Sequence, residues 1–127
     1  MADVNRGARP LSPHLQIYRP QWTSFSSIMV RATGIACYGL AILVVAWFLA
    51  AAGSERAFEI VDGLLTSWLG DLIMFLGTWA IWYHMLGRLR HVIWDLGYLL
   101  EVDVSEKMAI GMVAVATVLT ILTAIVV

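Results

Sequence analysis

The sequence predicts an all-α membrane protein, a bundle of three transmembrane helices with its N terminus inside and its C terminus outside. Of its 127 residues, 61% are hydrophobic and only 13% are charged, and the mean hydropathy is +0.82. These values lie beyond ordinary soluble globular usage. Long uncharged stretches recur, and the basic residues gather on one side of them. Water is therefore not the main solvent of this chain.

The first helix is expected over about residues 24–52. No residue from 32 to 52 is charged, and a helix that rises about 1.5 Å per residue crosses a hydrocarbon core of about 30 Å within such a stretch. Residues 53–63 are polar and predict a surface loop that could hold a short amphipathic turn.

Two further helices are expected over about residues 64–91 and 104–127. Asp71 lies near the start of the first of these, where its carboxylate can remain at the outer interface at modest cost. Residues 108–127 are again uncharged and long enough to reach the far side of the bilayer. Three spans follow.

Orientation comes from the basic residues, because Lys and Arg favour the inner side of a membrane. Seven of the eight fall on one side of the predicted spans. They are Arg6, Arg9, Arg19, Arg31, Arg88, Arg90 and Lys107. Only Arg56 lies elsewhere, so the N terminus and second loop are inside. Residues 1–127 then form a single transmembrane domain, in which residues 1–23 are an inner-side segment.

The N-terminal segment does not resemble a signal peptide. It lacks a continuous apolar run, and Pro10, Pro13 and Pro20 would interrupt one. Because the chain begins at Met1 without an obvious transit sequence, a multi-pass protein of the bacterial inner (cytoplasmic) membrane is favoured over one of the mitochondrial inner membrane.

Several function classes lack their signatures in this chain. No nucleotide-binding, acyl-transfer or metallohydrolase motif appears. Cys37 is the only cysteine, so there is no internal disulfide and no CxxC pair for zinc or an iron–sulfur cluster. A net charge of -1 offers no broad basic field for nucleic acid.

The tryptophans are expected to anchor the helices at the membrane interface, and the glycines are expected to allow close helix packing. Neither set is expected to form a chemical site. Indole rings prefer the headgroup zone, and glycines let helices approach closely. The anchors are Trp22, Trp68 and Trp94, and the close-packing positions are Gly34, Gly39 and Gly77.

Ser27 and Arg31 are four residues apart and share one face at the inner end of the first helix. Taken alone, the arginine could snorkel to the interface and the serine could be a helix-start hydroxyl. Together, a hydroxyl and a fixed cation at the apolar boundary suit a ligand with a carbonyl oxygen and an apolar tail, such as a quinone.

His84 lies four residues before Arg88, and therefore about 6 Å deeper than the inner interface. An unpaired imidazole in hydrocarbon is costly, so this side chain needs a partner. One interpretation is a hydrogen bond to a neighbouring helix, and the other is axial ligation of a haem iron.

Because the second helix returns through the bilayer, Arg31 and His84 are expected at similar depth. A haem bound at His84 would present its propionates to Arg31, Arg88 or Arg90. His91 lies on roughly the same face as His84 and cannot reach the opposite side of the porphyrin, so it is either an interfacial polar residue or a propionate contact. If the iron takes two histidines, the second comes from another subunit.

With these residues in place, the chain resembles the cytochrome b membrane-anchor subunits of succinate dehydrogenase, respiratory complex II. The similarity spans nearly the full length. The motifs that carry it are Arg9-Pro10-Leu11-Ser12-Pro13-His14-Leu15, Tyr18-Arg19-Pro20-Gln21, Ser27-Ile28-Met29-Val30-Arg31-Ala32-Thr33-Gly34, and His84 followed by Arg90-His91, Asp95 and Gly97.

The resemblance implies that Ser27 and Arg31 help bind ubiquinone near the iron–sulfur subunit, and that His84 is one axial ligand of a haem b shared with a second small membrane subunit. It also implies an anchor for the flavoprotein and iron–sulfur subunits, with no activity expected from the chain alone. Electrons from succinate would then reduce ubiquinone.

Two positions depart from the family pattern. Val30 stands where the family usually has histidine, and Arg88 stands where a small residue is usual, with the glycine displaced to Gly87. Arg88 could therefore take over part of the propionate and quinone-edge contacts.

Two other classes of protein are alternatives to this interpretation. One is an anchor that binds neither haem nor quinone, which the intact His84, Ser27 and Arg31 oppose. The other is a small transporter or assembly factor. Transporters usually show a polar midplane or broken helices, whereas the middle of these spans is apolar.

Overall fold

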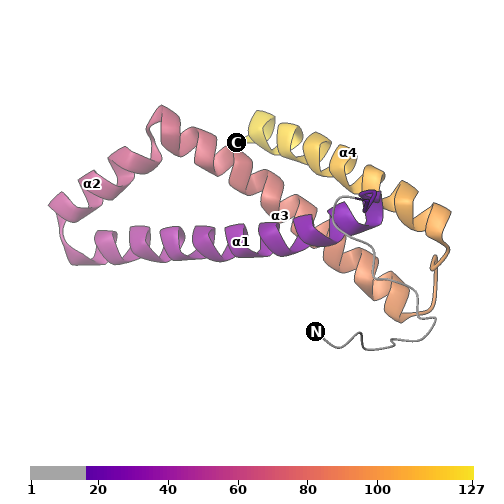
Figure 1. The fold of residues 1–127 in the computed structure, drawn as a ribbon. Coiled ribbons are helices and arrows are strands. Elements are labelled where there is room, and N and C mark those ends of the chain that lie inside the picture. The colour runs from indigo at the N-terminus through magenta and orange to yellow at the C-terminus, as the bar shows by residue number, and fades with distance from the viewer. Residues whose placement is uncertain (1–16) are drawn as a thin grey trace, which may run out of the picture.

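A computed structural model describes residues 17–127, which form four helices and no strand (Figure 1). The helices are α1 (Trp22–Gly53), α2 (Glu55–Leu65), α3 (Trp68–Asp95) and α4 (Val102–Val126). By length and composition, α1 and α4 can each cross a membrane, and α2 with α3 can do so as one span bent by 68°. The all-helical class is confirmed, with two candidate spans, or three if the bent pair is one. Arg6, Arg9 and His14 lie outside the described residues.

The polar segment after α1 is a complete helix, where the sequence predicted a loop with a short turn. Ser54 caps it, because its hydroxyl accepts a hydrogen bond from the backbone N–H of Ala57 at 3.2 Å. Its charged residues are exposed or half-buried, while its half-buried apolar residues recur every three or four positions, at Ala57, Phe58, Val61 and Leu65. Polar composition alone does not distinguish a loop from an amphipathic surface helix.

A tight turn separates α2 from α3, so α3 begins later than expected. The Ser67 hydroxyl accepts a hydrogen bond from the N–H of Gly70 at 3.2 Å and donates one to the carbonyl of Leu64 at 2.7 Å. A Cβ at Gly70 would collide with the backbone carbonyl of Leu65. Asp71 is exposed in the first turn of α3, where a negative charge favours the helix dipole.

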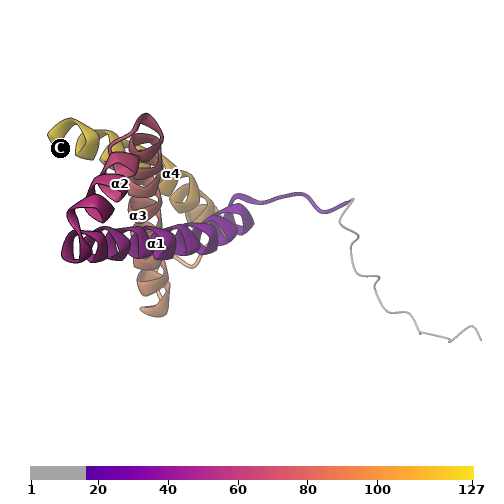
Figure 2. The same ribbon diagram turned by 90° about the vertical axis from the view of Figure 1, so that its left-hand side faces the viewer.

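Helix α3 is the centre of the fold and contacts the three other helices. Helix α1 crosses α3 near the start of α1 and then diverges from it, and α2 bridges the two helices where they are apart (Figures 1 and 2). The buried core lies at this crossing. It consists of Val30 from α1, Tyr83 from α3, and Met112 and Ala116 from α4.

Tryptophan and threonine side chains join α3 to α4. The indole N–H of Trp79 donates to the Thr117 hydroxyl, and that of Trp82 donates to the Thr123 hydroxyl, each at 3.1 Å. A donor in hydrocarbon finds no water, so these bonds satisfy groups that would otherwise be costly. Each threonine hydroxyl also donates to a carbonyl one turn earlier in α4.

Two of the three expected glycines permit close packing. A Cβ at Gly34 would lie 2.9 Å from Cε1 of His84, and one at Gly77 would lie 2.7 Å from a methyl of Leu40. Nothing lies within 4 Å of a Cβ built on Gly39, so this glycine is not used for packing within the described part of the chain.

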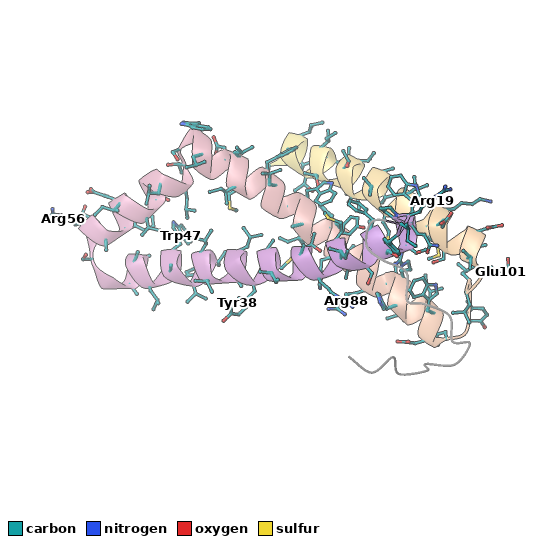
Figure 3. All side chains as sticks on the ribbon, in the orientation of Figure 1. Arg19, Tyr38, Trp47, Arg56, Arg88 and Glu101 are labelled. Atoms are coloured by element: carbon teal, nitrogen blue, oxygen red, sulfur yellow. The ribbon has the colours of Figure 1, made fainter. Side chains whose placement is uncertain are left out.

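The start of α1, the end of α3 and the start of α4 lie toward one end of the molecule, which we term the basic end (Figure 1). Arg19 and Arg88 lie toward this end, whereas Arg56 lies at the opposite end (Figure 3). This gathering agrees with the distribution of basic residues along the sequence. Which side of the membrane each end faces stays a prediction.

Large apolar side chains cover the outside of the bundle. Examples are Ile35 at 75% exposure, Phe48 at 61% and Leu76 at 57%. Exposed apolar surface on this scale requires lipid or further protein subunits around it.

We predict that Gly70→Ala lowers the thermal unfolding midpoint of the detergent-solubilised protein, because the added methyl meets the Leu65 carbonyl. Overpacking of this kind costs about 1–3 kcal/mol. Gly63→Ala is the matched control. Gly63 lies in α2 with open space at its Cβ, so the change should leave the midpoint equal or higher. Equal midpoints for Gly70→Ala and the unmodified protein would show that the turn tolerates a side chain.

Candidate functional site

His84 on α3 docks directly on the backbone of α1. Its Nδ1 lies 2.9 Å from the carbonyl oxygen of Val30 and 3.5 Å from the Thr33 hydroxyl. That hydroxyl also donates to the carbonyls of Val30 and Met29, at 3.1 Å and 2.8 Å. The absence of a side chain at Gly34 leaves room for the imidazole ring. The carbonyl of Val30 and the space beside Gly34 on α1 therefore determine where the His84 ring lies.

The hydrogen bonds also determine which ring nitrogen carries the proton. A carbonyl oxygen only accepts, so Nδ1 of His84 must donate to Val30. Nε2 is then the acceptor, and it receives a hydrogen bond from Nε of Arg88 at 3.2 Å. The two bonds require the same tautomer. With Nδ1 bonded to a backbone carbonyl, Nε2 is the nitrogen that carries the lone pair, which is the arrangement that metal-ligating histidines use.

Arg88 is exposed, one turn after His84 on the same helix. Because its long side chain is on the surface, it can leave Nε2 without disturbing the core. Figure 3 shows it beside the crossing of α1 and α3. The sequence placed Arg88 near a ligand's carboxylates, and the structure places it against the imidazole itself.

Ser27 and Arg31 lie in the first third of α1, near the basic end. Ser27 is half-buried and Arg31 is exposed, while the intervening Val30 is buried against α3. Arg31 directly follows Val30, whose carbonyl binds His84, so the arginine and the imidazole lie at one level. Neither Ser27 nor Arg31 has a hydrogen-bond partner among residues 17–127.

His91 is half-buried on α3 and bonds within its own helix. Its Nδ1 lies 2.7 Å from the carbonyl of Gly87, and its ring meets that of Trp94 edge-on at 5.4 Å. The structure therefore brings Arg31, His84 and Arg88 to one region, and it places His91 two turns further toward the end of α3.

Sequence reasoning missed several buried polar residues around this region. Tyr83 is fully buried, and its hydroxyl donates to that of Ser26 at 3.3 Å, joining α3 to α1. Thr33 is also buried. Their spacing could have revealed them, because Ser26, Val30 and Thr33 recur with the helical period on the face of α1 that carries no charge.

Arg90 is the other residue whose position the sequence did not reveal. The sequence predicted it on the inner side as a possible propionate contact, yet its side chain is only 2% exposed. Its guanidinium lies over the ring of Trp94, 4.4 Å from the ring centre, and Asp95 is exposed. Nothing in the sequence separates this arginine from its neighbour Arg88, which is exposed.

Fold and site together define a class of protein. It is a small helical membrane subunit that presents a histidine and arginines where two helices cross near one end, and the second nitrogen of the histidine is covered only by the exposed side chain of Arg88. The family model for succinate dehydrogenase/fumarate reductase transmembrane subunits matches residues 5–123.

Individual relatives agree with this match. The chain is 47% identical over 126 residues to the succinate dehydrogenase cytochrome b556 subunit of Paracoccus denitrificans, covering 99% of this chain and 97% of that protein. It is 34% identical over 119 residues to the cytochrome b560 subunit of Marchantia polymorpha, covering 90% and 87%. The chain belongs to the family of succinate dehydrogenase/fumarate reductase transmembrane subunits, and as such it is a membrane anchor of complex II.

Proposed function

We propose that this chain binds haem b through His84 and, with a second small membrane subunit, binds ubiquinone through Ser27 and Arg31. The observation that carries the proposal is the hydrogen bond of His84 to the Val30 carbonyl, 2.9 Å long. It accounts for Nδ1 and leaves Nε2 for a metal. The names of the relatives above, which call them cytochromes b556 and b560, support the haem.

The residues present fit a haem in three respects. His84 has the tautomer that ligation by Nε2 needs, and a backbone carbonyl holds its ring orientation, as the second shell of metal-bound histidines commonly does. Arg31 and Arg88 are exposed cations at the same level, suited to pair with propionates. His91 is a further propionate candidate on α3. When bound, the haem would supply a one-electron carrier near the quinone.

The hydrogen bond between His84 and α1 does not compete with iron. The sequence offered helix–helix bonding and haem ligation as alternative roles for this histidine. Because the two roles use different ring nitrogens, one imidazole can serve both. Only the bond from Arg88 must break, and that side chain is exposed.

Ser27 and Arg31 are proposed to hold one carbonyl oxygen of the quinone. Reduction of a quinone to a quinol takes two electrons and two protons, and negative charge develops on its oxygens as electrons arrive. A hydroxyl and a guanidinium placed to donate to that oxygen would stabilise this charge. Their lack of partners among the described residues leaves both free to donate. The electrons come from the iron–sulfur subunit.

The remaining parts of the proposal concern the assembly. The flavoprotein and iron–sulfur subunits would lie at the basic end, on the inner side of a bacterial cytoplasmic membrane, with the C terminus outside. The second membrane subunit would cover the open side of His84 and supply the other axial ligand. The broad exposure of apolar side chains supports such a neighbour.

We predict that His84→Gln abolishes the spectrum of a haem with two axial histidines in the purified complex, because the iron loses one ligand. His91→Gln is the matched control, since His91 bonds to the carbonyl of its own helix and a propionate contact is not a ligand of the iron. It should keep that spectrum. The measurement is the absorption spectrum of the oxidised and reduced complex. An unchanged spectrum in His84→Gln would remove the ligand assignment.

A side chain at position 34 should disturb the ligand without removing it. In Gly34→Val the new Cβ would lie 2.9 Å from Cε1 of His84, so the ring must move and haem content should fall. Gly39→Val adds the same side chain on α1 where the Cβ meets open space, and haem content should hold. The haem content per complex of the two variants is measured by the pyridine haemochrome assay. Equal content in both variants would contradict the docking of His84 on α1.

We expect Arg31→Leu to lower ubiquinone reduction by roughly 10- to 100-fold, the worth of a charge-assisted hydrogen bond of about 1.5–3 kcal/mol. Ser27→Ala should lower it less. Succinate oxidation with a soluble dye should remain, since the dye bypasses the quinone site. Arg56→Leu, in the first turn of α2 at the opposite end of the molecule, is the control. Parallel loss of both activities in Arg31→Leu would indicate a folding defect instead of a quinone contact.

A further inference from the structure

Arg90 is a buried cation to which the proposed haem and quinone sites assign no role, although the sequence named it among the possible propionate contacts. Its side chain is 2% exposed, and its Nε and Nη1 atoms are buried without a hydrogen-bond partner among the described residues. A buried charge that lacks a partner is strongly destabilising, whereas a paired one is tolerated. Arg90 is therefore expected to meet an anion that is not part of this described chain.

The surroundings hold this guanidinium in one place. It lies 4.4 Å over the Trp94 ring, and the indole N–H of Trp94 donates to the carbonyl of Leu99 at 3.2 Å. Leu99 has a φ of 57°, a left-handed conformation that a leucine rarely adopts. The loop after α3 thus adopts a strained backbone conformation at the residue that holds the Trp94 ring. The Trp94 ring in turn packs against the guanidinium of Arg90.

Arg90 lines a groove of about 180 Å³ between α3 and α4. Every other lining residue is apolar or glycine: Leu86, Leu89, Ile93, Met108, Gly111, Met112 and Val115. The groove lies near the basic end, because Arg90 precedes the last residue of α3, Asp95, by about 7.5 Å along the helix axis. A single cation at this depth, beside a purely apolar channel, matches a molecule with an anionic head and a hydrocarbon tail.

We propose that this groove binds an anionic phospholipid, whose phosphate pairs with Arg90 and whose acyl chain lies between α3 and α4. Charge complementarity carries the choice, because Arg90 is the one polar side chain that lines the groove, and a guanidinium pairs strongly with a phosphate. Position supports it, since Arg90 lies close to the end of α3, where the sequence predicts the inner membrane interface. The exposed aliphatic side chains beside the groove, Leu89 at 53% and Val115 at 45%, continue the apolar surface for the tail.

Two variants test the head and the tail separately. Arg90→Gln removes the cation. Gly111→Leu fills the groove while leaving Arg90 in place, and a Cβ at Gly111 meets nothing within 4 Å, so the fold can accept it. The matched controls are Arg56→Gln, an exposed arginine, and Gly39→Leu, a glycine of α1 that also has open space at its Cβ.

Native mass spectrometry measures the binding of phosphatidylglycerol, and separately of phosphatidylcholine, to the delipidated complex. We expect one tight phosphatidylglycerol site. Its affinity should fall by about tenfold or more in Arg90→Gln, the worth of one strong hydrogen bond, and it should also fall in Gly111→Leu, because the leucine occupies the place of the acyl chain. Both controls should bind as the unmodified complex does. Phosphatidylcholine should bind more weakly throughout, because it carries no net charge.

Three results would overturn the proposal. The first is phosphatidylglycerol binding unchanged in both groove variants. The second is equal preference for the two lipids. The third is release of another subunit by Arg90→Gln with lipid binding intact in Gly111→Leu, which would assign the anion to a protein carboxylate. The readout needs neither haem nor quinone, so its failure is distinct from failure of the proposed function.

Discussion

The hydrogen bond between His84 and the carbonyl of Val30 is the contact on which the arrangement near the basic end depends. It can form only because Gly34 presents no side chain to the imidazole. It brings α1 and α3 together where they cross, and it places Arg31 at the level of the ring. It also selects the tautomer that leaves Nε2 available. One short contact therefore joins helix packing to the chemistry of the site.

Most polar groups within the bundle follow the same rule as His84, because hydrocarbon offers no water to satisfy them. Trp79 and Trp82 bond to threonines of α4, and Tyr83 bonds to Ser26. These links cross between helices, so they hold the helices in register as well as removing the cost of burial. Arg90 departs from the rule within the described residues, which is why its surroundings point to a ligand.

The sequence predicted the all-helical class and the long apolar helices, because uncharged length is a property of the chain in order. Its prediction failed at residues 53–63, since an amphipathic helix and a polar loop share a composition. It predicted that Arg31 and His84 meet at one level, and it named both possible partners of the histidine. It gave no indication that Arg90 is buried while Arg88 is exposed.

What the amino-acid order determined by itself was the solvent of the protein, the lengths of its helices, and the residue types near its basic end. These follow from local chemistry, because burying a charge or an open backbone group in lipid is costly wherever it occurs. The tertiary structure alone decided which nitrogen of His84 is free and which arginine faces inward. Both depend on how α3 is rotated against α1 and α4, and that rotation is set by contacts between residues far apart in the chain.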